Sequence, residues 1–115
     1  MVTSWLSGRK VSIVLTSDIV LAGSKMFNVH LDVIYGDNRT VFICRARFAL
    51  YMVLHLRGAS KAQIGRIMRR DHTTVIHGLD RAEWIMERDD SFKRAVNELV
   101  NMNVDLGYGE KEQVE

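Results

Sequence analysis

Apolar residues recur along most of this chain at the spacing of helices that bury one face. The clearest case follows Asp71, where apolar residues occur at intervals of four, three and four: Val75, Leu79, Ala82 and Met86. Four polar residues fall outside this apolar stripe: Thr73, Thr74, His77 and Arg81. This pattern predicts an amphipathic helix whose polar face is turned outward.

The same spacing predicts a series of helices before Asp71. Ser17 is a predicted N-cap for a helix to about Asn28, and Gly36 is predicted to end a short helix over 31–35. A segment over 41–57 is apolar on most sides, so it is the expected central core helix.

The segment around Asp71 has the signals of two consecutive capped helices. Ser60 and Gln63 fit a capping box that opens a short helix. Arg69 and Arg70 form a predicted tight turn, and Asp71 is a predicted N-cap for the longer helix. A short helix, a turn and a longer helix with a polar outer face predict a helix-turn-helix.

The predicted fold is therefore all-α: a compact domain of five to six helices that contains a helix-turn-helix, similar to the Trp repressor. The 115 residues suit one such domain, placed at 17–105 with a closing helix from Asp89 to about residue 104. Residues 1–16 are expected to form a partly extended arm, and residues 106–115 a flexible acidic tail. The absence of proline favours helices, and the single Cys44 excludes an internal disulfide.

Charge is unevenly distributed, although the net charge is only +2. Residues 1–38 are balanced, residues 39–81 hold nine basic residues against two acidic ones, and residues 82–115 hold four basic residues against nine acidic ones. A polyanion would therefore be attracted to the middle of the chain and repelled by its end.

The first turn of the predicted longer helix is slim and polar, as entry into a DNA major groove requires. Asp71 can accept a hydrogen bond from cytosine N4, and Thr73 can contact a thymine methyl group. His72 can pack on a methyl group or donate a hydrogen bond. Arg69 and Arg70 flank this turn and are predicted to contact phosphates.

Residues 70–77, Arg-Asp-His-Thr-Thr-Val-Ile-His, resemble the signature of the C-terminal DNA-binding domain of DnaA, the bacterial chromosomal replication initiator. Residues 19–104 also follow that domain's order of helices. The resemblance implies a minor-groove contact for Arg39 and base contacts for Asp71, His72 and Thr73. It implies phosphate contacts for Arg45, Arg47, Lys61 and Thr74, and a position beside the backbone for Ala62. His77 is either a further DNA contact or simply an exposed residue of the helix.

The chain departs from the family pattern at four points. Met68-Arg69 replaces a glycine before the Arg-Asp-His string, and Gly78 replaces an alanine. Arg39 stands beside Asp37 where the family has several basic residues. The initiator's ATPase module has no counterpart, because no Gly-x-x-x-x-Gly-Lys-Ser/Thr loop occurs in this sequence.

The leading hypothesis is a DNA-binding protein of the cytoplasm, associated with the nucleoid, that recognises sites in duplex DNA as a monomer. It is expected to need no cofactor or metal and to have no enzymatic activity. It would regulate transcription or assist replication, in a phage, a prophage or a bacterium. His72 and His77, five residues apart, are poorly spaced as metal ligands, and no second carboxylate supports a nuclease that would use Asp71 and His72.

One alternative stays open. The same scaffold could instead contact another protein, including the replication initiator. The acidic end of the chain and Trp84, which lies off the apolar stripe, motivate this reading. Trp84 is expected either to pack on the closing helix or residues 1–16, or to mark a partner surface.

Overall fold

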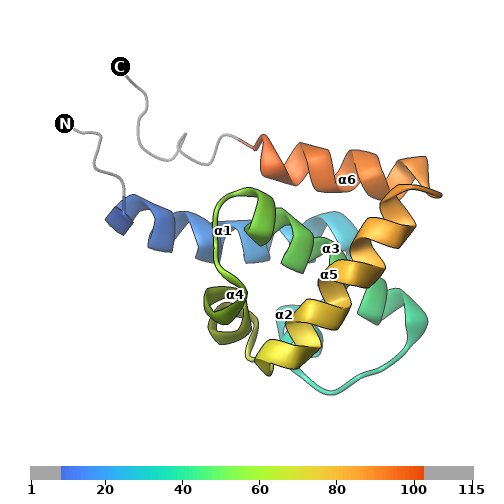
Figure 1. The fold of residues 1–115 in the computed structure, drawn as a ribbon, viewed down its shortest axis with the longest axis horizontal. Coiled ribbons are helices and arrows are strands. Elements are labelled where there is room, and N and C mark those ends of the chain that lie inside the picture. The colour runs from blue at the N-terminus through green and yellow to red at the C-terminus, as the bar shows by residue number, and fades with distance from the viewer. Residues whose placement is uncertain (1–8, 103–115) are drawn as a thin grey trace.

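The computed structural model describes residues 9–102, which contain six helices and no strand (Figure 1). The helices are α1 (Arg9–Phe27), α2 (Leu31–Tyr35), α3 (Val41–Leu56), α4 (Lys61–Met68), α5 (His72–Met86) and α6 (Asp90–Val100). The prediction of an all-helical fold with a helix-turn-helix is confirmed. No helix in the described range is long and apolar enough to cross a membrane.

Two predicted helix boundaries are wrong. Helix α1 begins at Arg9, so Ser17 lies inside a helix and does not cap one, and residues 9–16 are helical. The β-branched residues near the start of α1 favour extended structure only weakly, and no glycine or proline breaks the helix before Gly23. Helix α6 ends at Val100, four residues before the predicted end. The predicted arm over 1–8 and the tail over 106–115 lie outside the described residues.

The predicted caps of the later helices are confirmed by hydrogen bonds. The Ser60 hydroxyl accepts from the Gln63 amide at 3.1 Å, and the Ser60 amide donates to the Gln63 side chain at 2.8 Å. Asp71 caps α5 through the Thr73 amide, and Asp89 caps α6 through two amides. These local bonds satisfy amides that have no partner within the helix, so the starts of α4, α5 and α6 were predictable from sequence.

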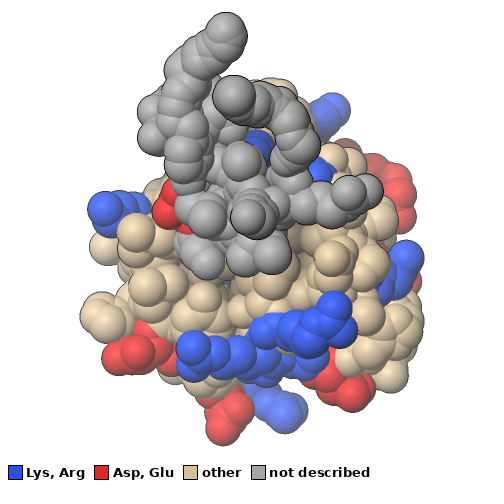
Figure 2. All heavy atoms as spheres, turned by 90° about the vertical axis from the view of Figure 1, so that its left-hand side faces the viewer, with Lys and Arg blue, Asp and Glu red and all other residues tan. Residues whose placement is uncertain are grey.

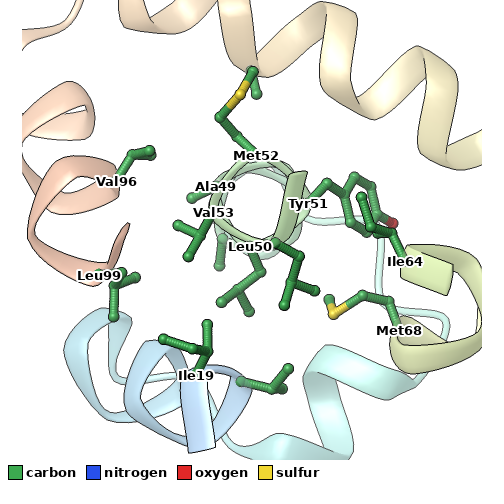
Figure 3. Close-up of a cluster of buried hydrophobic side chains, with 14 of the residues drawn as sticks. Ile19, Ala49, Leu50, Tyr51, Met52, Val53, Ile64, Met68, Val96 and Leu99 are labelled. Atoms are coloured by element: carbon green, nitrogen blue, oxygen red, sulfur yellow. The ribbon is translucent and has the colours of Figure 1, made fainter. Parts of the chain in front are cut away.

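Helix α3 lies at the centre of the fold, with neighbouring helices on every side (Figure 3). Six consecutive residues of α3, from Ala49 to Leu54, are buried. Around this helix, Tyr51 points toward Ile64 of α4, while Ala49 and Val53 lie on the side that faces α6. Helices α4 and α5 therefore pack on α3 with their inner faces and expose their outer faces to solvent.

Gly78 of α5 is required by the close approach of α5 to α3. A Cβ atom at Gly78 would lie 2.3 Å from Cδ2 and 2.4 Å from Cε2 of Tyr51, a ring that is itself buried. Both distances are far below van der Waals contact. The glycine therefore lowers the helical propensity of α5 but lets the Tyr51 ring pack directly on the backbone of this helix.

We expect Gly78→Ala to lower the free energy of unfolding by about 1–3 kcal/mol, because the added methyl group overpacks the Tyr51 contact. At an exposed helix position the same change would raise it by about 1 kcal/mol. Urea denaturation followed by circular dichroism measures the difference. Tyr51→Leu should cost less in the Gly78→Ala background than in the wild type, and equal costs in both would contradict the packing explanation.

Candidate nucleic-acid interface

A turn of three residues joins α4 to α5. Arg69 adopts the left-handed conformation, with φ 59° and ψ 46°, and the Arg70 amide donates to the Gly65 carbonyl at 2.8 Å. A Cβ atom at Gly65 would lie 2.7 Å from the Arg70 carbonyl oxygen, so the turn packs directly on the backbone of α4. Arg69 thus occupies a conformation that usually favours glycine.

The start of α5 is accessible to solvent. Asp71, His72, Thr73 and Thr74 are all exposed, whereas Val75 immediately after them is completely buried. One carboxylate oxygen of Asp71 accepts from the Thr73 amide at 3.2 Å, which fixes the start of the helix. We call residues 71–74 the α5 tip.

Several basic side chains in the segments that precede the α5 tip along the chain are exposed. Arg39, Lys61, Arg66 and Arg69 are exposed, as is Ala62. Figure 2 shows the face that lies on the left in Figure 1, where Lys and Arg side chains form a band along its lower part and acidic side chains lie at the margins. In Figure 1, α4 and the start of α5 lie in the same lower half of the molecule. This face of the molecule therefore presents accessible positive charge.

Arg47 does not belong to this surface, so the prediction that it contacts phosphate is wrong. Its side chain is 5% exposed. Its Nε donates to the Ile34 carbonyl at 2.9 Å, and its Nη2 donates to the Val33 and Gly36 carbonyls at 2.8 and 3.0 Å. Burial, together with the nearby Arg70 charge, lowers the pKa of Arg47. A guanidinium with its donors bound in the interior has none to offer a phosphate.

The guanidinium of Arg70 also has partners within the protein, and the phosphate contact predicted for it stays a prediction. Nη1 donates to the Tyr35 carbonyl at 3.2 Å, and Nη2 donates to the carbonyls of Ile34, at 3.3 Å, and Gly36. Arg69, by contrast, is exposed, with its guanidinium carbon 4.2 Å from the centre of the Tyr35 ring.

Arg45 remains accessible in part. Its side chain is 36% exposed, and Nη2 lies 2.5 Å from Oδ2 of Asp89, the N-cap of α6. Its guanidinium also lies over the Phe92 ring. Hydrogen bonds from Ser91, followed by the Phe92 amide, lower the pKa of Asp89. Arg45 therefore has an intramolecular partner in the structure, and its phosphate contact stays a prediction.

Sequence comparison identifies the family of this motif. Residues 16–81 match the family model described as the bacterial dnaA protein helix-turn-helix. This chain belongs to the DnaA helix-turn-helix family. The match covers α2 to α4, most of α1 and the first two-thirds of α5, including the whole α5 tip. The chain therefore contains a DNA-binding helix-turn-helix.

Individual DnaA proteins agree with this assignment. The chain is 34% identical over 89 residues to the chromosomal replication initiator protein DnaA of Lachnoclostridium phytofermentans, which covers 75% of the chain. It is 31% identical over 77 residues to DnaA of Mycoplasma pneumoniae and 29% identical over 98 residues to DnaA of Streptococcus thermophilus. The chain spans only 18–22% of the length of these curated relatives.

Trp84 lies beyond the matched part of the DnaA family model. It is 47% exposed on α5, and the guanidinium carbons of Arg81 and Arg88 lie 4.9 and 4.2 Å from its ring centre. Arg88 also donates to the Trp84 carbonyl at 2.9 Å and pairs with Glu87. The indole is thus an accessible aromatic surface between two cations.

The sequence analysis did not identify the residues whose carbonyls accept hydrogen bonds from Arg47 and Arg70. The carbonyls of α2 and the residues after it accept from side chains 9 to 36 positions away in the chain. A carbonyl acceptor exists at every residue, so no residue type signals the contact.

Proposed function

We propose that this chain binds specific sites in duplex DNA, of the kind recognised by the DnaA family, by placing the α5 tip in the major groove. The observation that carries the proposal is the exposure of four consecutive polar residues at a capped helix start, directly in front of a buried core residue. A helix fits the major groove, where its side chains reach the base edges that distinguish all four base pairs.

Each tip residue has a chemical role in this proposal. Asp71 accepts from cytosine N4, Thr73 contacts a thymine methyl group, and His72 packs beside it or donates. Thr74 and the free amides of the first turn of α5 bind phosphate, assisted by Lys61 and Arg69. Arg39 enters the minor groove, where its charge is attracted by the negative potential. His77, one turn further along α5, and Ala62 are additional contacts.

The biological output that we propose is occupancy of such sites by a monomer. The protein would regulate transcription or assist replication by marking or competing for sites of the initiator, without using ATP itself. Binding by a single domain suits this role, since one recognition helix and one minor-groove arginine read adjacent parts of one site.

A salt-titrated binding assay tests the proposal. Fluorescence anisotropy would compare a duplex that carries a DnaA box with a scrambled duplex of the same composition. We expect the box to bind about 10³-fold more tightly at physiological salt. Both affinities should fall with salt, because phosphate contacts release counterions. Equal affinities for the two duplexes at every salt concentration would contradict sequence recognition.

Substitutions at Asp71 separate its capping role from base reading. Asp71→Ala should lower the free energy of unfolding by about 1 kcal/mol through loss of the cap. Asp71→Asn keeps the cap but replaces one carboxylate oxygen by a donor group, so it should retain stability and change the preferred base at one position. Urea denaturation and binding to single-base variants of the box measure the two effects. An unchanged base preference in Asp71→Asn would remove Asp71 from the reading set.

The exposed Trp84 favours a second candidate function, contact with another protein. Tryptophan and arginine are the residues most enriched at the energetic centres of protein interfaces, and here two arginines flank the ring. Retention of the purified replication initiator on the immobilised protein, at high salt and after DNA digestion, would support it. Trp84→Ala should then abolish retention, and retention by both forms alike would place the contact elsewhere.

A further inference from the structure

The carboxyl end of α2 presents a cluster of backbone carbonyls that other elements must satisfy. The last carbonyls of any helix have no partner within that helix. Here the chain also runs on through Gly36 to Asn38 without entering another helix until Val41. The segment over 33–38 therefore offers several acceptors close together, immediately before the loop that carries Arg39.

Arg47 of α3 satisfies this cluster from one side. Its donors reach Ile34, Val33 and Gly36, as described above, and Nη1 also donates to the Asn38 carbonyl at 2.5 Å. Arg39 is the next residue after Asn38. The base of the Arg39 side chain is thus one residue away from a hydrogen bond that ties the loop to the core helix.

Arg70 satisfies the same cluster from the helix-turn-helix. Its guanidinium shares the Ile34 and Gly36 carbonyls with Arg47 and adds the Tyr35 carbonyl. The neighbouring Arg69 stacks on the Tyr35 ring. His72 is two residues after Arg70, so the α5 tip is joined to this carbonyl cluster by a very short stretch of chain.

We propose that Arg47 and Arg70 are positioning residues that fix the Arg39 loop relative to the α5 tip and thereby set which sites the protein recognises. The inference rests on the proposed function, in which Arg39 reads the minor groove and the tip reads the major groove. One carbonyl cluster, held by two guanidinium groups, links both reading elements. A rigid link favours DNA in which both contacts form at once, because little loop freedom is lost on binding.

The test uses Arg70→Lys in the full chain, which keeps the positive charge but replaces a planar fork by one ammonium group. In the wild type, Arg39→Ala should weaken binding to the box duplex about 10-fold, the equivalent of about 1.4 kcal/mol. In the Arg70→Lys background the same change should cost less than about 3-fold, since the loop no longer holds Arg39 in place. Binding of Arg70→Lys to the scrambled duplex should stay within about 2-fold of the wild type, because this substitution keeps the net charge. Arg66→Lys, an exposed change on α4, is the matched control and should leave the Arg39→Ala cost unchanged.

A second measurement keeps the inference separate from the proposed function. Hydrogen exchange at the amides of residues 38–40 should become faster in Arg70→Lys and stay unchanged in Arg66→Lys. Arg70→Met provides the same readout if the lysine variant is too unstable. An equal Arg39→Ala cost in both backgrounds would overturn the inference. If the wild type does not prefer the box, the proposed function is contradicted. In that case the hydrogen-exchange measurement still tests the positioning role, and unchanged exchange in the loop would overturn it.

Discussion

Replacing His72 and Thr73 together by alanine is expected to reduce the preference for a box duplex over a scrambled duplex by about 100-fold or more. Each good contact to a base edge contributes about 1–3 kcal/mol of discrimination. Both side chains are exposed and neither holds the core, so the free energy of unfolding should change by less than about 0.5 kcal/mol. Anisotropy titrations with the two duplexes and urea denaturation provide the two measurements.

Glu83→Ala is the matched control for this prediction. Glu83 is exposed on the same helix but lies 10 positions beyond Thr73, about 15 Å along the axis. It should leave the preference for the box unchanged. A double variant that retained the wild-type preference would show that the α5 tip does not read the bases.

The second large effect concerns stability. Arg47→Met is expected to lower the free energy of unfolding by about 3–5 kcal/mol. Methionine fills similar space but donates no hydrogen bond, so the Val33 and Asn38 carbonyls lose their guanidinium donor, and Ile34 and Gly36 keep only the donors of Arg70. Each unsatisfied buried polar group costs about 1–3 kcal/mol. Thermal and urea denaturation would show the loss, together with faster hydrogen exchange in α2.

Arg45→Met is the matched control, two residues away on the same helix. Arg45 forms a partly exposed ion pair, whose loss should cost at most about 1 kcal/mol. For DNA binding we expect the opposite ranking, with the larger effect in Arg45→Met, because of these two arginines only Arg45 can reach a phosphate. The slope of log affinity against log salt should decrease in magnitude by about 0.9 in Arg45→Met. Equal destabilisation by the two substitutions would contradict the distinction between them.

Local sequence signals predicted the parts of the fold that depend on neighbouring residues. Capping bonds join residues two or three positions apart, so Ser60, Asp71 and Asp89 could be recognised from the sequence. The apolar spacing of α5 likewise placed Val75, Leu79 and Ala82 in the core. The candidate tip followed from the cap at Asp71 and from the polar residues that directly precede Val75.

Long-range contacts decided the rest. Arg45 and Arg47 are the same residue type two positions apart, yet a helix rotates by about 200° between them, so one faces Asp89 and the other the interior. Nothing in the local sequence reveals which of the two faces inward. The effect of Gly78 on stability likewise depends on Tyr51, 27 positions earlier in the chain. Helix propensity alone counted this glycine as a loss of stability, whereas the packing makes it necessary.

The same reasoning explains why the arginines of 39–70 could not be sorted from sequence. An arginine is the same residue in the sequence whether its side chain binds a phosphate or a backbone carbonyl. The structure divides them by exposure and by partner: Arg39 and Arg69 are exposed near the tip, whereas Arg47 and Arg70 hold the end of α2. Charge counting therefore overestimated the phosphate contacts available to DNA.

Selection of bound sequences from random duplex DNA tests sequence recognition by the α5 tip most directly. The wild-type protein is expected to enrich one recurring motif of adjacent bases, and the variant that lacks both His72 and Thr73 side chains should lose that motif while still retaining DNA at low salt. Enrichment of no common motif by the wild type, or of the same motif by both proteins, would contradict major-groove reading by this helix.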